Sequence, residues 1–143
     1  MRILIRTLIF FIVLLHLPGI ETNAQVFRDK RGARLGTYDE NGIVRDSRGT
    51  RIASLDKNNI LRNNKGVRII IFDENGIIRN NKGVRIGSID KKAIVRNTLN
   101  RRIGSIDEKG LIRDASGKRI GEARNIPNKI IAWFYFFKSS NKS

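Results

Sequence analysis

Hydrophobic and polar positions recur along this chain with a constant spacing of 17 residues, which is visible when the sequence from Val26 onward is written in rows of that length. Columns 1, 2, 10 and 13 are apolar, columns 3 and 9 are always arginine, and column 14 is aspartate in every row but the last. A spacing kept without a gap is typical of a repeat protein, in which each unit buries its apolar face against its neighbours. The units begin at Val26, Ile43, Ile60, Ile77, Ile94 and Leu111.

Each unit predicts two short strands and two tight turns. The first strand, such as Ile43 to Arg45, is rich in β-branched residues, and the second corresponds to Arg51 to Leu55. Between them lies a turn such as Asp46 to Gly49, which is opened by an Asp or Asn side chain and closed by a residue that tolerates positive φ. A second turn, such as Asp39 to Gly42, leads into the next unit. Hairpin should therefore follow hairpin, and no segment after residue 24 has the spacing of a helix.

A single hairpin of this length is barely stable in water, so the units need a shared core. We therefore predict an all-β fold, a radial array of short antiparallel hairpins built from five to six 17-residue repeats. Column 11 is small in five units, which suits close approach between neighbouring hairpins. The third unit departs from this, because Ile69 to Phe72 is wholly apolar. This run predicts either a locally thicker core or an exposed sticky patch.

The repeat ends at Asn125 to Pro127, and a different kind of segment follows. Ile130 to Phe137 is a run of eight apolar residues that includes the only tryptophan. It is too short to cross a bilayer as a helix. One interpretation is a final strand or plug that packs against the repeat core. The other is an aromatic segment that contacts a membrane interface or a partner protein, and an exposed segment of this composition would be prone to aggregate.

The first residues are typical of a secretory signal peptide. A basic start, Met1 to Arg6, precedes the apolar stretch Leu8 to Leu17, and a small residue, Ala24, marks the expected cleavage site. An uncleaved anchor is the alternative. We therefore expect an exported protein, periplasmic or secreted, whose mature chain begins at Gln25. The predicted parts are a signal peptide (1–24), a β-hairpin repeat domain (25–126) and an apolar C-terminal segment with a polar tail (127–143).

The composition argues against an enzyme. The chain has no cysteine, which excludes a lipoprotein anchor and a disulfide framework, and its one histidine, His16, lies in the predicted signal peptide. A mature chain without these residues lacks the commonest metal ligands and the commonest general base. No phosphate-binding glycine loop, metal cluster or catalytic triad is present. We expect no catalytic residues, no cofactor and no metal.

Charge makes anions the natural ligands. Removing residues 1–24 takes two arginines and one glutamate from 29 basic and 13 acidic side chains, which leaves a net charge of about +15. A strongly basic chain favours anionic surfaces and polyanions. Bases need aromatic stacking platforms, however, and Phe27, Tyr38 and Phe72 are the only aromatic residues within the repeat. This scarcity disfavours specific nucleic-acid recognition.

The arginine columns admit two interpretations. Columns 3 and 9 should lie opposite each other in a hairpin, and like charges in that position destabilise the pair. The recurring aspartates of column 14 could offset the repulsion by bridging neighbouring hairpins. Alternatively, the guanidinium groups could face a polyanion, namely lipopolysaccharide phosphate, an acidic glycan or nucleic acid. The candidate anion-binding residues are Arg45, Arg51, Arg62, Arg68, Arg79, Arg85, Arg96, Arg102, Arg113 and Arg119.

The last unit carries a resemblance to a known family. Ile112 to Gly121, preceded by Asp107 to Gly110 and followed by the aromatic-rich tail, resembles the five-fold β-flower proteins, small exported bacterial proteins made of repeated hairpins. The resemblance covers about 26–137 and implies a radial arrangement of hairpins, with Val26-Phe27 and Ile120-Gly121 left over to close a ring. It implies no activity. The chain departs from the family pattern at turn-closing positions such as Ala93, which bears on local turn geometry and not on the architecture.

Two functional hypotheses follow. The first is a non-catalytic exported structural or interaction domain whose ligand or partner is unknown. The second is a binding module for anionic envelope polymers that uses the repeated arginine columns.

Overall fold

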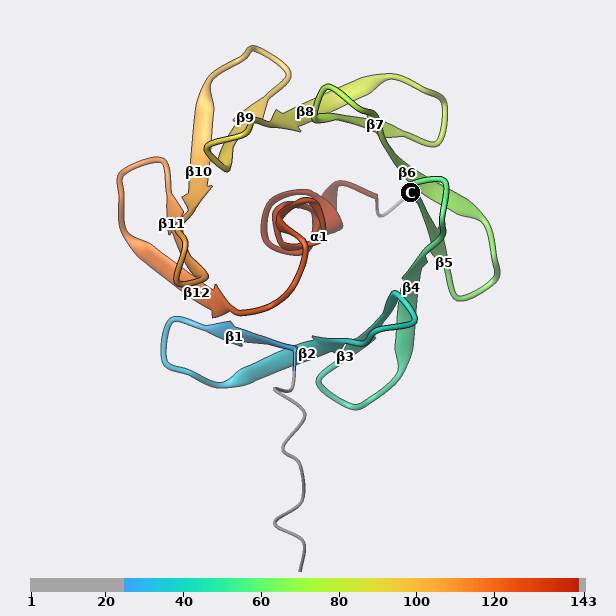
Figure 1. The fold of residues 1–143 in the computed structure, drawn as a ribbon, viewed down its shortest axis with the longest axis horizontal. Coiled ribbons are helices and arrows are strands. Elements are labelled where there is room, and N and C mark those ends of the chain that lie inside the picture. Colours follow the sequence, from blue (N-terminus) through green and yellow to red (C-terminus); the bar gives the residue numbers. More distant parts are fainter. Residues whose placement is uncertain (1–24, 142–143) are drawn as a thin grey trace, which may run out of the picture.

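Twelve short strands, two from each 17-residue unit, form one closed antiparallel barrel in the computed structural model, which describes residues 25–141. Figure 1 shows the ring of hairpins viewed along its axis. The strands are β1 (Val26–Asp29), β2 (Arg34–Tyr38), β3 (Ile43–Asp46), β4 (Arg51–Leu55), β5 (Ile60–Asn63), β6 (Arg68–Phe72), β7 (Ile77–Asn80), β8 (Arg85–Ile89), β9 (Ile94–Asn97), β10 (Arg102–Ile106), β11 (Leu111–Asp114) and β12 (Arg119–Ala123).

The barrel closes within one chain. The first and last strands, β1 and β12, pair antiparallel with Phe27 opposite Ala123 and Asp29 opposite Gly121. The expectation that strands at the two ends of the repeat close a ring is therefore confirmed. All six units form a hairpin of their own, and five further hairpins link one unit to the next. The ring thus has six units.

One turn geometry serves both ends of the barrel. In the turn within the second unit, Asp46 Oδ1 accepts bonds from the backbone N–H groups of Arg48 (2.9 Å) and Thr50 (3.0 Å). In the turn between the second and third units, Asp56 Oδ1 makes the same two kinds of bond. The closing residue always has positive φ, even at Ala93 (φ 57), where no glycine is present. The departures from glycine thus leave the turn geometry unchanged.

Each unit also carries a β-bulge. The register shifts between columns 2 and 3 of every unit, as between Val44 and Arg45. A bulge bends its strand and increases the local twist. The ends of the six hairpins accordingly project from the ring, as Figure 1 shows.

The core lies inside the ring. Strand alternation points columns 2, 11 and 13 inward, and the column 2 side chains are all fully buried. Column 10 is half-buried against this core. In the apolar run of the third unit, Ile70 and Phe72 are buried, so this run thickens the core. The column 2 residues are Phe27, Val44, Leu61, Ile78, Val95 and Ile112.

The C-terminal segment is a helix inside the barrel (Figure 1). It consists of α1 (Asn128–Ala132), the π-helical η1 (Trp133–Phe137) and the 3-10 turn η2 (Lys138–Asn141), and we call 128–141 the axial segment. The expectation of a strand and of no helix is wrong here, whereas the plug interpretation is correct. An amphipathic period arises when one helix face meets solvent. This helix is surrounded by the barrel wall, so its sequence shows a continuous apolar run.

The axial segment packs closely against the barrel wall. The ring of Phe134 stacks on that of Phe27 with centroids 3.9 Å apart. Three successive aromatic residues then lie over the column 11 glycines of three successive units: Tyr135 over Gly121, Phe136 over Gly104 and Phe137 over Gly87. A Cβ at any of these glycines would collide with the ring and with a neighbouring strand carbonyl. The small column therefore admits both the next hairpin, as expected, and the axial segment.

The buried axial segment has little surface to offer a membrane. The side chains of Ile130, Ile131, Ala132, Trp133, Phe134 and Phe137 are buried, and Tyr135 and Phe136 are half-buried. The alternative contact of Ile130 to Phe137 with a membrane interface therefore lacks an exposed face. Within 25–141, no helix is long and apolar enough to cross a membrane. The predicted signal peptide lies outside the described residues.

Candidate functional site

Positive charge is concentrated in one part of every unit. We call columns 3–9 of each unit, which contain the hairpin turn within the unit, the tip segments. They carry 19 basic and 3 acidic residues. Residues 35–129 outside the tip segments carry 6 basic and 9 acidic residues. The excess positive charge therefore lies in the tip segments. The tip segments are 28–34, 45–51, 62–68, 79–85, 96–102 and 113–119.

The two arginine columns face each other across each tip segment, as expected. Arg45 pairs with Arg51 and Arg62 with Arg68 in the strand register, and the same holds in the other units. The column 3 arginine also folds over its own turn. Arg62 Nη1, for example, donates to the carbonyl of Gly66 at 3.2 Å. The candidate arginines thus come together as pairs within each unit, and the pairs form a belt around the barrel.

Aspartates of column 14 offset part of the repulsion. For three of them, a carboxylate Oδ2 lies close to a guanidinium nitrogen. The distances are 3.3 Å from Asp56 to Arg62 Nε, 3.4 Å from Asp73 to Arg79 Nε and 3.6 Å from Asp90 to Arg96 Nη2. One carboxylate performs two tasks, because Oδ1 accepts the turn N–H bonds while Oδ2 meets the guanidinium. Turn N–H bonds, first that from Ile60, and the Arg62 guanidinium lower the pKa of Asp56.

The column 9 arginines bond along their own strands. Arg51 Nη2 donates to Ser54 Oγ at 3.0 Å, and Arg102 donates to Ser105 in the same way. In the third unit the equivalent serine is replaced by Ile71, and Arg68 instead donates to the carbonyl of Asn81 in the next unit (3.0 Å). The side chain that loses its local acceptor therefore links two hairpin tips.

These contacts leave donors facing solvent. A guanidinium has five N–H donors, and the bonds described above use one or two of them. Arg62 and Arg119 keep 40% and 41% of their side-chain surface exposed. Fixed, outward-facing guanidinium groups suit phosphate, sulfate and carboxylate oxygens. The belt can therefore hold the hairpins together and still present donors to an anion.

The sequence prediction of the site was incomplete. It omitted Arg28 and Arg34, which occupy the same two columns in the first unit and are exposed. It also omitted the basic residues at the hairpin tips, such as Arg48, Lys65 and Lys82, all of which are exposed. Counting charge by column would have revealed them.

Comparison with known proteins settles the family. A family model described as 5-fold beta-flower protein matches residues 24–138. The chain belongs to this family. The resemblance in the last unit and the radial array of hairpins are therefore confirmed. No curated protein and no solved structure gives a significant match to the chain.

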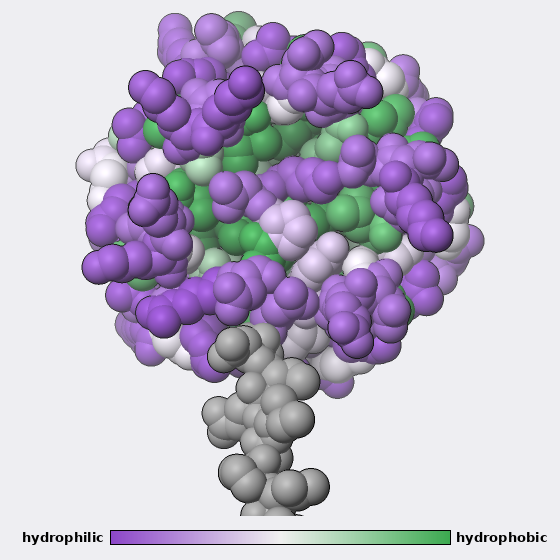
Figure 2. Space-filling model, viewed as in Figure 1, coloured by the Kyte–Doolittle hydropathy of each residue, from purple (hydrophilic) through white to green (hydrophobic). Residues whose placement is uncertain are grey.

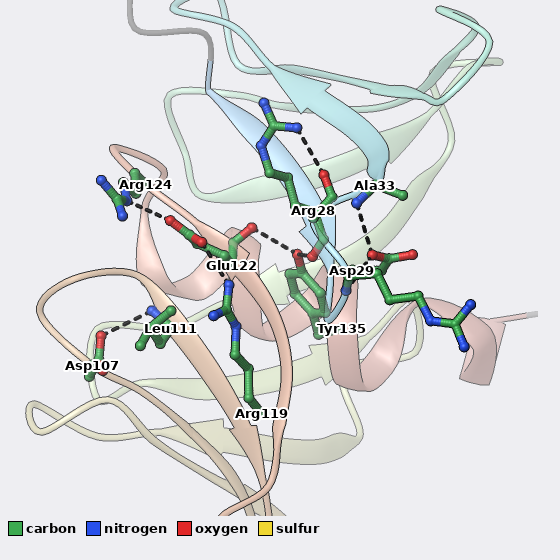
Figure 3. Close-up of polar contacts among 11 residues, drawn as sticks. Arg28, Asp29, Ala33, Asp107, Leu111, Arg119, Glu122, Arg124 and Tyr135 are labelled. Atoms are coloured by element: carbon green, nitrogen blue, oxygen red, sulfur yellow. Dashed lines mark hydrogen bonds and ion pairs between the residues drawn. The ribbon is translucent and has the colours of Figure 1, made fainter.

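The last unit of this β-flower carries a local reversal of charge (Figure 3). Glu122 occupies the column where three other units have serine, and Arg124 replaces the column 14 aspartate. Glu122 Oε2 lies 2.8 Å from Arg119 Nη2, and Glu122 Oε1 lies 2.6 Å from Arg124 Nε. Ala123 to Ile126 of the last unit, together with the turn Asp107 to Gly110 of the fifth unit, line an open depression of about 630 Å³ beside the start of α1. No group of acidic residues among the described residues could hold a metal ion there.

Figure 2 shows one face of the β-flower, where hydrophilic residues surround apolar residues at the centre of the ring.

Inside the barrel, the hydroxyl of Tyr135 in the axial segment contacts backbone carbonyls of β1 and β12, the two strands that close the ring. Burial raises the pKa of Tyr135 to about 12. The hydroxyl therefore stays protonated and able to donate over the ordinary pH range.

Proposed function

We propose that this β-flower protein is a non-catalytic, exported interaction domain that binds a polyanion of the cell envelope through its tip segments. The segregation of charge carries the proposal. The tip segments hold a net charge of about +16, whereas residues 35–129 outside them hold about −3. Charge concentrated in one part of a molecule attracts a polyanion far more strongly than the same charge spread evenly.

The architecture supports a polymeric ligand. Charges are screened beyond about 8–10 Å at physiological ionic strength, so a small anion would contact only one unit. An anionic polymer can contact several units at once, and the separate contacts then reinforce one another. The axial segment fills the barrel, which holds the units in fixed positions. A rigid array loses little conformational entropy on binding.

The test is retention on immobilised heparin and on immobilised lipopolysaccharide at increasing salt. Wild-type protein is expected to elute well above physiological salt. Changing Arg48, Lys65 and Lys82 to Gln should lower the elution salt markedly. The matched control changes Lys57, Lys91 and Lys109 to Gln, which removes the same charge from exposed positions between units. Equal effects of the two triple variants would overturn the proposal, because net charge alone would explain retention.

The arginine belt needs its own variant. Arg51, Arg102 and Arg119 are exposed members of column 9, and their change to Gln should lower retention while unfolding remains cooperative. Retention equal to wild type would mean that the column 9 arginines only stabilise the fold and that the basic residues at the hairpin tips bind the polyanion.

Export is tested by the mass of the protein isolated from cells. Cleavage after Ala24 is expected, which gives a mature N-terminus at Gln25 in the periplasmic or secreted fraction. A full-length chain in the membrane fraction would instead support the uncleaved anchor.

A further inference from the structure

Three hairpin tips carry exposed apolar side chains. Val67 is 53% exposed, Val84 is 57% exposed and Leu99 is 70% exposed, and these are the large hydrophobic residues that the described chain leaves most accessible. They belong to the third, fourth and fifth units, whose hairpins β5–β6, β7–β8 and β9–β10 are neighbours along one arc of the ring (Figure 1). We call these three residues the apolar tips.

Nothing in the turn geometry requires them. The other units place Ala33, Thr50 and Lys118 in the column of Val67 and Val84. The backbone bonds are nevertheless the same, since the turns of Thr50 and Val67 close with N–H···O distances of 2.9 and 2.8 Å. Val67 and Val84 therefore expose apolar surface but are not needed to form the turn.

The same three units lack carboxylates in their tip segments. Their turns open with Asn63, Asn80 and Asn97, whereas the turns of the other three units open with aspartate. Asparagine makes the same two turn bonds: Asn63 Oδ1 accepts from Lys65 and Val67 at 2.9 and 3.0 Å. The substitution therefore preserves the turn and removes a negative charge. The third to fifth tip segments carry nine basic residues and no acidic residue.

Exposed apolar side chains on tip segments that carry basic residues and no carboxylate fit one kind of partner best. A soluble polyanion would bind the basic residues but would make no favourable contact with the apolar ones. An anionic bilayer binds both kinds of residue. Basic side chains contact the lipid phosphates, and apolar side chains enter the boundary between headgroups and acyl chains. Three neighbouring tips are enough to define one plane of contact.

We infer that the apolar tips insert into an anionic lipid surface while the basic residues around them contact the lipid phosphates. This inference rests on the proposed function and names one surface on which it operates. The arc of the third to fifth units meets the membrane, and the acid-containing turns of the other three units lie away from the insertion site.

The experiment is co-sedimentation of the mature protein with phosphatidylcholine vesicles, with and without phosphatidylglycerol. The test variant carries Val67→Thr, Val84→Thr and Leu99→Ser, each taken from the same column of another unit (Thr50 and Ser116). It keeps every charge and should fold normally. We expect a loss of at least about tenfold in the partition coefficient for anionic vesicles. Its retention on heparin should equal that of wild type.

The insertion depth can be followed directly because the chain has no cysteine. A single Leu99→Cys variant labelled with an environment-sensitive dye should show a blue shift with anionic vesicles. The same label at Ser116→Cys, the equivalent position in the last unit, should show little change. Equal shifts at the two positions would overturn the assignment of the arc.

The outcomes separate the two proposals. Heparin retention without vesicle binding would overturn the membrane inference and leave the proposed function standing. Vesicle binding unchanged in the triple variant would overturn insertion. Protein that binds neither heparin nor vesicles would overturn both. Capture of the apolar tips by a protein from envelope extract, without vesicle binding, would replace the lipid with a protein partner.

Discussion

The hydroxyl of Tyr135 donates a 2.6 Å hydrogen bond to the backbone carbonyl of Arg28. The same oxygen lies 3.2 Å from the carbonyl of Glu122. Arg28 and Glu122 are opposite residues of β1 and β12, the two strands that close the barrel (Figure 3). The axial segment therefore bonds to the one seam that joins residues distant in the chain. Closure of that seam carries the largest loop-entropy cost in the fold, so a contact there has a large effect.

Replacing Tyr135 with Phe should destabilise the barrel by about 1–2 kcal/mol, because the carbonyl groups of Arg28 and Glu122 lose the one O–H donor that they share while the ring still packs. Urea unfolding measures this, and amide exchange in β1 and β12 should accelerate more than in β6 and β7. Tyr38→Phe is the control, since Tyr38 lies in β2, which is not one of the two seam strands, and it has no hydroxyl bond to β1 or β12. Comparable losses from the two changes would contradict a special role for the seam.

Alkaline pH should act through the same hydroxyl. The pKa of Tyr135 is raised from 10.0 to about 12, chiefly by burial, so the folded state binds the proton more tightly than the unfolded state. The resulting stability is complete below about pH 10 and is lost as pH rises toward 12. Unfolding of wild type and Tyr135→Phe, compared from about pH 8 to 11, should show a smaller alkaline loss in the variant. A parallel decline of the two proteins would show that other groups control the alkaline transition.

The column 11 glycines should be sensitive to a single methyl group. A Cβ at Gly104 would collide with the ring of Phe136 and lie 2.6 Å from the carbonyl of Arg113. We expect Gly104→Ala to cost about 1–3 kcal/mol through overpacking. In a double-mutant cycle, Phe136→Ala should partly rescue Gly104→Ala. Additive losses would show that the strand carbonyl, and not the aromatic ring, excludes the methyl group.

The sequence predicted most of the barrel and little of its interior. The 17-residue spacing identifies strands, turns and the opposed arginine columns, because each follows from contacts within one or two units. The axial helix escaped prediction because a helix buried on every side, from Ile130 to Phe137, has no polar face to mark its period. The number of units in the ring also escaped, since closure pairs Phe27 with Ala123 across the whole domain.

The candidate site was predicted only as far as contacts within one hairpin define it. Opposed pairs such as Arg45 and Arg51 follow from hairpin register alone. The double use of Asp56, in its turn and against Arg62, depends on side-chain positions that only the folded chain fixes. The exposed residues Val67 and Leu99 gave no sequence signal, because apolar residues at hairpin tips look like ordinary core positions until their exposure is known.

Turn strain offers a stabilising variant. Ala93 has φ 57, a left-handed conformation that costs an L-residue about 1–2 kcal/mol and glycine nothing. Glycine loses about 0.5–1 kcal/mol through its greater freedom in the unfolded chain, so Ala93→Gly should raise stability by roughly 0.5–1 kcal/mol. Asn100→Gly is the matched control with φ 61, and it should change stability less because asparagine tolerates this region. Thermal unfolding measures both, and destabilisation by Ala93→Gly would mean that burial of its methyl group outweighs the strain.

Acid should act through the turn carboxylates. The pKa of Asp56 is lowered first by the backbone N–H of Ile60, and also by Asn58 and Arg62. The folded state therefore favours the ionised form, and its stabilising effect is present above the ordinary pKa of 3.8 and lost as pH falls through the lowered value. Asp56→Asn keeps the turn, as Asn63 does in its own turn. The variant should therefore be less stable than wild type at neutral pH, and the difference should shrink as the pH falls below 3.8 and through the lowered pKa. Arg62→Gln should alter this acid dependence only slightly, because the turn N–H groups remain. If Arg62→Gln abolished the dependence as fully as Asp56→Asn, the ion pair and not the turn would control the protonation of Asp56.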